Sequence, residues 1–377
     1  MNRMFVEDCC EILDSMRIPI TAADRKEGEY PYYGANGIQD YVAGYIFDDE
    51  LVLLAEDGGN FGSKEKPIAY RVSGKCWVNN HAHVLKPKAG LDVDYLCYSL
   101  MFYKVDGMVN GATRQKLTQS AMRKMQIPSR CMEEQKHIVD ELNRIIKIKE
   151  QRQQELQLLD ELIKARFVEM FGDARKNPNK YDTVSFIDIV EYMGDIGSNG
   201  ANKVVVDHLD MKDKEDYAMM VRFTNFTKND FTDDVKYVSK EAYDFFKKSQ
   251  IFGGELIICK IGSAGQNYVM PYLNRPASLG LNQIMVRIKD NILMPYLYQY
   301  LHTDYGEFLI SGCINGAVTK TITKTELKKI PVMLPPMELQ REFVAFVEQV
   351  DKSKSVIEKS LKELETLQAS LMQKYFS

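Results

Sequence analysis

The spacing of apolar residues along the chain predicts two long helices. Between residues 132 and 171, apolar side chains recur every three or four positions, and neither proline nor glycine interrupts the run. Residues 337–376 show the same spacing. Such spacing keeps the apolar side chains in one narrow stripe, as in the seam of a coiled coil. At ~1.5 Å per residue, each segment would form a rod of about 60 Å.

The two predicted helices need partners for their apolar stripes, because a long helix gains most of its stability by packing one face. We expect them to pack on each other. Alternatively, each docks on its own domain or on another chain. Lys149 and Lys354 fall on the stripes where apolar residues are expected. They are either polar breaks that set the register between the helices or lysines whose ammonium groups reach solvent near a frayed end.

The chain also contains an internal duplication. The tripeptide Asn-Gly-Ala at residues 110–112 recurs 205 residues later, at 315–317. At the same offset, residues 132–171 and 337–376 are identical at ten of forty positions, well above the level expected by chance. The order along the chain is therefore a variable part, a shared part, a second variable part and a second shared part.

The two variable parts, residues 1–130 and 176–335, mix predicted strands with short helices. Apolar runs predict strands at residues 75–84 and 281–288, and residues 237–248 have the pattern of a short helix. Glycine-rich stretches between the runs are typical of turns. This mixture predicts an α+β fold for both parts.

Looser matches extend the duplication into the variable parts. Tyr95 aligns with Tyr296, and Asn80-His81 aligns with Asn282-Gln283. Each predicted globular unit is thus followed by its own copy of the long helix. The predicted boundaries are 1–130 for the first unit, 131–175 for its helix, 176–335 for the second unit and 336–377 for the second helix.

Composition is that of an ordinary globular protein large enough for two or three units, with 377 residues, 45% hydrophobic and 27% charged. The 49 basic and 53 acidic residues give a net charge of −4. This balance argues against a simple basic nucleic-acid-binding protein, because neutralising phosphates usually requires an excess of lysine and arginine. The balance holds in each of the four segments, so any DNA-binding face must gather its basic residues locally.

Several functional classes lack support in the sequence. No apolar run reaches the ~18–20 residues needed to span a bilayer, and the N-terminus has no secretory pattern, so no membrane partner is predicted. Seven cysteines without a C-x-x-C pair and five scattered histidines indicate reduced thiols of a cytoplasmic protein and no metal site.

No phosphate loop, dinucleotide fingerprint, nucleophile elbow or H-E-x-x-H helix is present, so no catalytic residue and no cofactor are predicted. Acidic pairs such as Glu56-Asp57 are interpreted as solvated surface groups.

A binding protein with two similar but non-identical heads on a rod remains. If the helices pack antiparallel, the heads acquire an approximate two-fold axis, which matches the symmetry of double-stranded DNA. Heads that differ would then read two different half-sites. A two-headed adaptor for protein ligands is the alternative, and an enzyme is a third class that the missing motifs disfavour.

Short motifs in an ordered, duplicated arrangement carry a family resemblance. They are YPYYGANGIQDY at residues 30–41, the Asn-Gly-Ala stretches leading to Ile-Pro at 127–128 and 330–331, PPMELQ at 335–340, and the terminal LMQKYFS. Over nearly its whole length, the chain resembles the specificity (S) subunits of type I restriction-modification enzymes. The resemblance implies two target-recognition domains, each followed by a long helix, with the two helices forming an antiparallel coiled coil.

The same resemblance implies the function and the partners. It implies a subunit without a catalytic centre that reads a bipartite double-stranded DNA target, one half-site per domain, with helix length setting the spacer. Two methyltransferase (M) subunits and the restriction (R) subunits are the implied protein partners. Cys131 stands in the place of Pro336 and Glu134 in the place of Leu339, so the entry to the first helix departs from the usual pattern.

Candidate DNA contacts follow from side-chain chemistry. Asn, Gln and Arg can make paired hydrogen bonds to base edges, whereas Lys, Ser, Thr and loop amides suit phosphates. Each candidate could instead be an ordinary exposed polar residue or a turn former. In the first domain the candidates are Asn80, His81, Arg114, Lys116 and Thr118, and in the second they are Asn282, Gln283, Lys320, Thr321 and Thr323.

Overall fold

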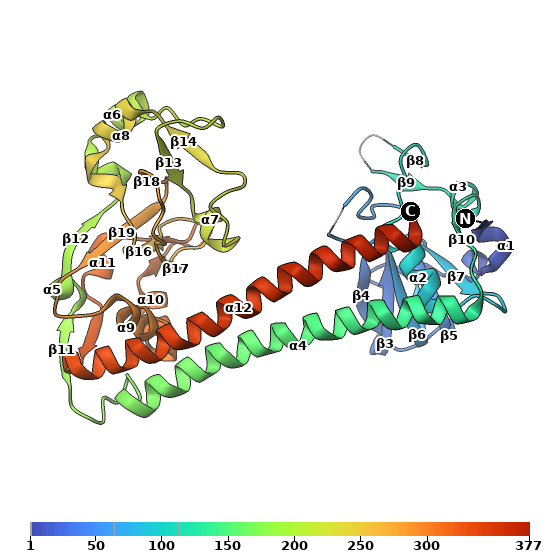
Figure 1. Ribbon diagram of the computed structural model, residues 1–377, viewed down its shortest axis with the longest axis horizontal. Helices are drawn as coiled ribbons and strands as arrows, with labels where there is room; N and C mark the ends of the chain where they lie inside the picture. The colour runs from blue at the N-terminus through green and yellow to red at the C-terminus, as the bar shows by residue number, and fades with distance from the viewer. Residues whose placement is uncertain (1, 64, 112–113) are drawn as a thin grey trace. The chain divides into compact units, whose positions relative to one another are not determined.

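The chain folds into two compact units, seen in a computed structural model that describes residues 2–63, 65–111 and 114–377 (Figure 1). Unit 1 comprises Met1–Gln154 and Glu358–Ser377, and unit 2 comprises Glu155–Ile357. Each unit therefore holds one globular head and a segment of both long helices. We call the globular part before residue 132 head 1, and residues 172–336 head 2.

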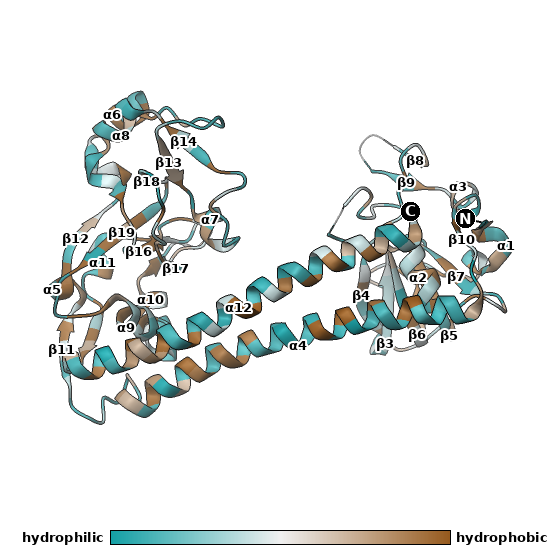
Figure 2. Cartoon of the chain, viewed as in Figure 1, coloured by the Kyte–Doolittle hydropathy of each residue, from teal (hydrophilic) through white to brown (hydrophobic). Residues whose placement is uncertain are grey.

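Both predicted long helices are present, each with 40 residues: α4 (Met132–Phe171) and α12 (Met337–Phe376). Apolar positions recur along both of them (Figure 2). In unit 1, Leu142 of α4 and Leu371 of α12 belong to the same buried core as head 1. In unit 2, Phe167 of α4 lies with its ring centroid 5.5 Å from that of Phe343 of α12, within the core of head 2. The apolar stripes thus pack both on a head and on the other long helix.

The helix segments run in opposite directions within each unit. In unit 1, Tyr375 donates to Glu141 at 2.5 Å, and Lys149, farther along α4, donates to Gln368 at 3.0 Å. In unit 2, Arg166 of α4 pairs with Glu342 at 2.9 Å, and Asp160, earlier in α4, pairs with Lys354, farther along α12.

Lys149 and Lys354, which interrupt the apolar stripes, make the same interhelical contact in their respective units. Lys354 Nζ lies 2.5 Å from Asp160 Oδ1, and Lys149 Nζ lies 3.9 Å from Glu365 Oε1. Glu365 follows Asp160 by the same 205 residues that separate the lysines. This geometry favours the polar-break interpretation over that of lysines reaching solvent at a frayed end.

Head 1 is built on a six-stranded sheet with the order β2-β7-β5-β6-β3-β4. Neighbouring strands are antiparallel except β3 and β6, which are parallel. The strands are β2 (Cys10–Ile12), β3 (Glu27–Gly34), β4 (Gly37–Val42), β5 (Phe47–Ala55), β6 (Ala69–Val78) and β7 (Ala82–Pro87).

Head 2 repeats the strand pairing of head 1 but divides it between two sheets. Its first sheet has the order β12-β19-β16-β17, in which β16 and β19 pair as β5 and β7 do in head 1. The second sheet, β14-β13-β18-β15, matches the β4-β3-β6-β5 part of the head 1 sheet, because β13 and β18 are parallel as β3 and β6 are, and the other neighbours are antiparallel. The strands are β12 (Val190–Gly194), β13 (Ala218–Val221), β14 (Lys236–Val238), β15 (Gln250–Ile251), β16 (Leu256–Cys259), β17 (Asn267–Val269), β18 (Ala277–Leu279) and β19 (Gln283–Ile288).

A short strand pair and one buried helix connect each head to its long helix. Tyr95 of α2 (Val93–Met101) donates to Pro128 O at 3.1 Å, and Tyr296 of α9 (Met294–Leu301) donates to Met333 O at 2.9 Å. The match between Tyr95 and Tyr296 is thereby confirmed. The strand pairs are β1 (Arg3–Phe5) with β10 (Gln126–Pro128), and β11 (Asp182–Ser185) with β22 (Pro331–Leu334).

The remaining helices are short. They are α1 (Val6–Cys9), α3 (Gln119–Arg123), α5 (Phe186–Ile189), α6 (Asn202–His208), α7 (Phe223–Thr227), α8 (Lys240–Phe245), α10 (Asp304–Gly312), α11 (Lys324–Leu327) and the 3-10 turns η1 (Asp14–Met16), η2 (Ile196–Asn199) and η3 (Lys247–Ser249).

Two local predictions are corrected by the structure. The strand predicted at 75–84 is two strands, because Asn79 accepts a hydrogen bond from the amide of His81 at 2.8 Å and turns the chain between β6 and β7. The helix predicted at 237–248 is confined to α8, since Tyr237 lies in β14. The strand predicted at 281–288 is confirmed as β19.

The structure also bears on the expected reduced cysteines and on the expected absence of a membrane-spanning helix. All seven cysteines are free thiols, and only Cys131 is exposed. Among the residues that the structure describes, no helix combines the length and apolar character needed to cross a membrane.

One buried glutamine anchors the start of α4 to head 1. Gln135 is fully buried, and its Oε1 accepts a hydrogen bond from the amide of Asp92 at 2.8 Å. Its Nε2 donates to the carbonyl oxygens of Gly90 and Arg130, both at 2.9 Å. Asp92 is the residue that caps α2, so the glutamine ties the first turn of α4 to the start of α2.

Gln340 makes the equivalent anchor in unit 2. It is also fully buried; its Oε1 accepts from the amide of Leu293 at 2.9 Å and its Nε2 donates to Pro335 O at 2.9 Å. Leu293 directly precedes α9, as Asp92 precedes α2. Both anchors use backbone groups of the head, so they depend little on the side chains around them.

Replacing Gln340 with alanine should lower the free energy of unfolding by about 2–3 kcal/mol, because the half-buried Leu293 amide and the buried Pro335 carbonyl lose their hydrogen-bond partner. Urea denaturation of the wild-type and Q340A chains measures this difference. The matched control is Gln349→Ala, an exposed position on the same helix, which should change stability by less than about 0.5 kcal/mol. Equal effects of the two substitutions would contradict the anchoring role.

Candidate nucleic-acid interface

Each head carries a short hairpin with a glycine at its turn. β8 (Val109–Asn110) pairs with β9 (Lys116–Leu117), and β20 (Ile314–Asn315) pairs with β21 (Thr321–Ile322). Gly111 and Gly316 both adopt φ +102°, in the left-handed region that glycine favours. A Cβ on them would lie 2.3 and 2.2 Å from a backbone carbonyl oxygen, so a larger residue does not fit. Ala112 of the first tripeptide lies outside the described residues.

The candidate threonines Thr118 and Thr323 cap the short helices that follow these hairpins. Thr118 Oγ1 accepts from the amide of Ala121 at 3.2 Å at the start of α3 (Gln119–Arg123). Thr323 Oγ1 accepts from the amide of Glu326 at 3.3 Å at the start of α11 (Lys324–Leu327). Because a cap uses the oxygen as acceptor, each hydroxyl keeps its hydrogen available as a donor.

The hairpins are joined to the sheets by matching backbone hydrogen bonds. Leu117 N donates to Glu56 O at 2.7 Å, and Glu56 N donates to His81 O at 2.8 Å. In head 2, Ile322 N donates to Lys260 O at 3.0 Å, and Lys260 N donates to Asn282 O at 2.7 Å. The hairpin, the end of the central strand and the turn before the next strand therefore adjoin in both heads.

This register corrects the alignment of the candidate residues. Asn282 occupies the position of His81, not that of Asn80, because both carbonyls accept from the residue that follows the central strand. A slip of one residue in a strand moves every side chain to the opposite face of the sheet. The sequence alignment therefore paired Gln283 with the wrong residue.

In head 1, three candidates converge on the acidic pair Glu56-Asp57. Asp57 Oδ1 lies 2.7 Å from Arg114 and 2.6 Å from Nδ1 of His81, and Lys116 Nζ lies 3.0 Å from Glu56 Oε1. The prediction that this pair is solvated is wrong: its side chains are only 12% and 19% exposed, because the chain turns beneath the hairpin after β5. The other candidate of the turn, Asn80, is exposed.

In head 2, the candidates are divided between surface and core. Lys320, Thr323 and Asn282 are exposed, and Thr321 is half-buried at the base of the hairpin. Gln283 is 1% exposed, and its Nε2 donates to Val221 O at 2.8 Å. Its amide thus points into the head, away from the surface where a base edge could be read.

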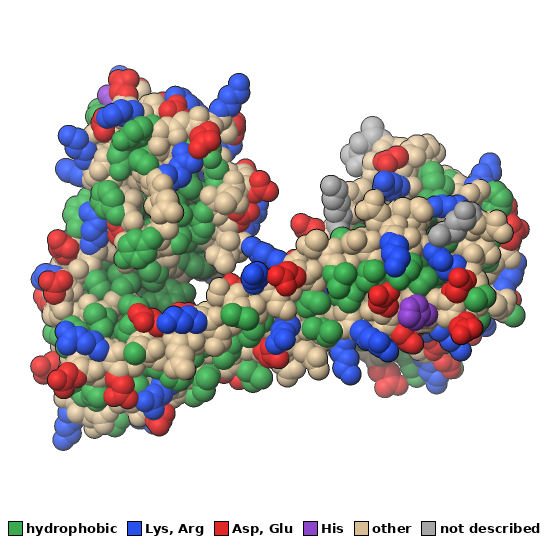
Figure 3. All heavy atoms as spheres, viewed as in Figure 1, with side chains coloured by type: hydrophobic (Ala, Val, Ile, Leu, Met, Phe, Trp, Pro, Cys, Tyr) green, Lys and Arg blue, Asp and Glu red, His purple; other side chains and the backbone are tan. Residues whose placement is uncertain are grey.

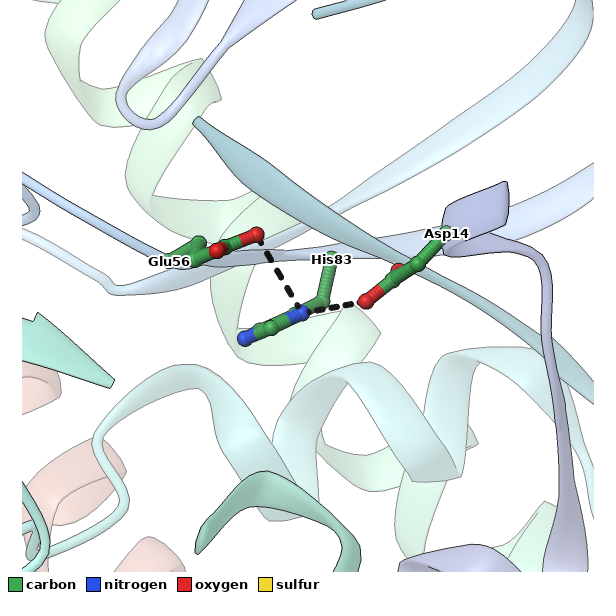
Figure 4. Close-up of side chains that lie close together, drawn as sticks. All are labelled: Asp14, Glu56 and His83. Carbon is green, nitrogen blue, oxygen red and sulfur yellow. Dashed lines mark hydrogen bonds and ion pairs between the residues drawn. The ribbon is translucent and has the colours of Figure 1, made fainter. Parts of the chain in front are cut away.

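A buried cluster that the sequence reading missed lies beneath the head 1 hairpin (Figure 4). His83 of β7 is fully buried, with Nδ1 2.7 Å from Asp14 and 3.7 Å from Glu56. Its Nε2 lies 2.9 Å from the carbonyl oxygen of Leu117 in β9. The cluster thereby connects the sheet to the hairpin.

The cluster of Asp14, Glu56 and His83 could bring three ligands to a metal ion, but its contacts fit an ion-paired network better. Both ring nitrogens of His83 already lie within hydrogen-bond distance of oxygen atoms, at 2.7 Å from Asp14 and 2.9 Å from Leu117 O. Arg17 donates to Glu56 at 2.6 Å and also pairs with Asp14. The two carboxylates therefore already have cationic partners in place.

Hydrogen bonding keeps Asp14 ionised despite its burial. Burial raises the pKa of its carboxyl, but the hydrogen bond and charge of His83 and the hydrogen bonds from the Val84 amide and Gln119 outweigh this effect. The pKa of Asp14 consequently lies below its ordinary value. Gln119, the first residue of α3, donates to Asp14 Oδ2 at 2.9 Å.

Asp195 occupies the equivalent place in head 2 with different partners. Its carboxylate oxygens lie 2.9 Å from Lys260 Nζ and 2.9 Å from Lys324 Nζ, and Ser198 donates to it at 2.9 Å. Burial would raise the pKa of Asp195, but these hydrogen bonds lower it to about 2. Asp195 follows Asp14 by 181 residues instead of 205, so a search at one offset could not find the pair.

Comparison with known proteins identifies the family. The model of the family described as "Type I restriction modification DNA specificity domain" matches residues 1–158 and 189–366. The chain therefore belongs to this family, and it carries two copies of the domain.

Individual relatives support the same assignment. A curated protein of Haemophilus influenzae named as a type I restriction enzyme specificity subunit is 27% identical over 351 residues, covering 92% of this chain and 86% of the relative. The fold is similar to that of the S subunit of a type I restriction-modification system from M. genitalium, with a TM-score of 0.56 and 14% identity over 100% of this chain and 96% of that one. A second solved structure, from work on complex assembly and conformational transition of the type I R-M system, gives a TM-score of 0.53 and 15% identity over 100% and 97% of the two chains.

Replacing Asp195 with asparagine should lower the free energy of unfolding at neutral pH by about 1–2 kcal/mol. The pKa of about 2 lies below the value of an unfolded aspartate, so the carboxylate contributes fully above about pH 5 and loses its contribution as the pH falls toward 2. Urea denaturation between pH 7 and about 2.5 should show the wild-type and D195N curves converging in acid. If the difference in unfolding free energy between wild type and D195N stays constant over this pH range, the stabilising role of the ionised Asp195 is contradicted. Asp244→Asn, which breaks an exposed pair with Lys240, is the matched control and should have little effect at any pH.

Proposed function

We propose that this chain is the non-catalytic DNA specificity subunit of a type I restriction-modification complex. The observation that carries the proposal is the glycine hairpin with its capped helix, built once in each head of a chain from the DNA specificity family. Two similar but non-identical surfaces suit a bipartite double-stranded DNA target, in which each head reads one half-site. We assign the target-recognition domains to residues 1–130 and 176–335, and the conserved helices to 131–175 and 336–377.

The proposed DNA contacts lie on the hairpins and on the turns beside them. Arg114 is suited to a base edge, because Asp57 fixes its guanidinium and leaves other N–H groups to donate. Gln283 is not retained as a contact, since its amide is buried. The retained contacts are Asn80, His81, Arg114, Lys116 and Thr118 in head 1, and Asn282, Lys320, Thr321 and Thr323 in head 2.

We further propose that α4 and α12 pair as an antiparallel coiled coil and that their outer faces dock two M subunits, with R subunits joining through the assembly in the cytoplasm. The opposite direction of the helix segments and the repeated lysine–acid contact support the pairing. Apolar side chains left outside the packed stripes support a protein-binding face. They include Leu162 and its counterpart Leu367, both 47% exposed, together with Leu158, Val168 and Val356.

Exchanging residues 1–130 for the first head of another family member should change one half of the modified DNA sequence and leave the other half unchanged. The reason is that each head would read its half-site with its own residues. Sequencing of methylated DNA from cells carrying the exchanged subunit and its M subunits provides the measurement. Changes in both halves would contradict the modular account.

The isolated chain should bind DNA only weakly. Its net charge is −4, and basic and acidic side chains are interspersed over the visible face of each unit (Figure 3). At about 150 mM salt we expect a Kd in the non-specific range of roughly 10⁻⁴–10⁻⁶ M, with tighter and more salt-dependent binding once M subunits are added. Filter binding across a salt titration, without and with M subunits, measures the affinity and its salt dependence. The absence of salt-dependent DNA binding even with M subunits present would refute the proposed function.

A further inference from the structure

We propose that Asp14 and Asp195 are positioning residues that hold the glycine hairpin and capped helix of each head in one place on the sheet. Each aspartate thereby determines how accurately its head discriminates among half-site sequences. This proposal rests on the proposed function, because it concerns the surface that would read DNA.

The two aspartates occupy equivalent places in the fold. Asp14 opens the turn η1 after β2, and Asp195 directly precedes η2 after β12. Each of these strands lies at the edge of the shared sheet, beside β7 in head 1 and β19 in head 2. Both aspartates are buried: Asp14 is 7% exposed and Asp195 is 6% exposed.

Each aspartate contacts the first residue of the capped helix. Gln119 donates to Asp14 at 2.9 Å, and Lys324, which follows Gln119 by 205 residues, donates to Asp195 at 2.9 Å. These residues come directly after the capping threonines. The carboxylate therefore fixes the end of the helix that faces the hairpin.

A second donor extends each contact to the hairpin strand. In head 1, His83 lies between Asp14 and the carbonyl oxygen of Leu117 in β9. In head 2, Lys260 bonds Asp195 through Nζ, while its carbonyl oxygen accepts from the amide of Ile322 in β21. One carboxylate thus joins the sheet edge, the hairpin and the helix in both heads.

The hairpins need such an anchor, because each of their strands contains only two residues. A two-stranded hairpin alone is at best marginally stable in water, so its position must come from contacts with the rest of the head. A buried carboxylate without its donors is strongly unfavourable, which disfavours other placements of the hairpin. The network would thus select one arrangement of the reading surface.

The side chains that contact the aspartate differ between the heads, whereas the aspartate itself is the same. Head 1 uses His83 and Arg17, with Gln119 as a neutral donor, whereas head 2 uses Lys260 and Lys324. The requirement at residue 119 or 324 is therefore a hydrogen-bond donor, not a charge. Glutamine should replace Lys324, but a residue without a donor should not.

The test uses the complete chain assembled with its M subunits on DNA duplexes that carry the target identified by methylation mapping. Methylation rates are compared between the intact target and targets with a single base change in one half-site or the other. D195N should reduce discrimination at the half-site of head 2 by roughly tenfold and leave the other half-site unaffected. D14N should show the reverse. The matched controls are Asp244→Asn, at an exposed carboxylate, and Asp49→Asn, at a half-buried one. Both carboxylates pair with lysines, and neither substitution should change either ratio.

Two Lys324 variants keep the proposal testable if an aspartate variant folds poorly. Lys324→Gln should retain discrimination at the half-site of head 2, because glutamine donates as Gln119 does. Lys324→Met, of similar length but without a donor, should lose it by roughly the same tenfold factor. Thermal unfolding of each variant shows whether a loss of discrimination results from a loss of stability instead.

The outcomes separate this inference from the proposed function. If D195N or Lys324→Met slows methylation of all targets equally, or if Lys324→Gln loses discrimination as Lys324→Met does, the positioning role is overturned. If the wild-type complex itself does not discriminate between the intact and altered targets, the proposed function fails instead.

Discussion

The structure depends on one contact, made twice, in which a buried glutamine anchors a long helix to its own head. A helix with a narrow apolar stripe is not stable alone, so its first turn must be held where the stripe meets a core. Gln135 and Gln340 achieve this by bonding backbone groups of the head. Because no side chain of the head takes part, the sequence of the head can change without loosening the helix. The same construction suits a protein whose heads must differ.

The hairpin surface that we propose contacts DNA shows a similar division between a fixed backbone and variable side chains. Leu117 and Ile322 make matching amide hydrogen bonds to the end of the central strand, yet that strand is followed by Glu56 in head 1 and Lys260 in head 2. The residue at this position therefore carries opposite charge in the two heads. Among the charged side chains that contact one another beneath the hairpins, the buried aspartate alone is common to both heads, which is why we assign it a positioning role.

The sequence predicted those features that repeat at one offset or one period. Both long helices and the strand at 281–288 were found because their apolar spacing is regular. The parts of each head that precede its glycine hairpin were harder to align, because the offset between equivalent residues changes along the chain. It is 201 residues between His81 and Asn282 and 181 between Asp14 and Asp195. The slip at Gln283 and the burial of Glu56-Asp57 both follow from this: strand register and the folding of a turn beneath a hairpin depend on distant contacts that periodicity does not encode.

The most direct test of the account gives both positions the same head. Residues 1–130 are replaced with residues 176–335, and the methylated sequence is mapped in cells that contain the matching M subunits. If the chain is a duplicated reader with a two-fold relation between its heads, the modified sequence should be a palindrome made of the second half-site and its inverted copy. An asymmetric modified sequence, or retention of the original first half-site, would contradict the account.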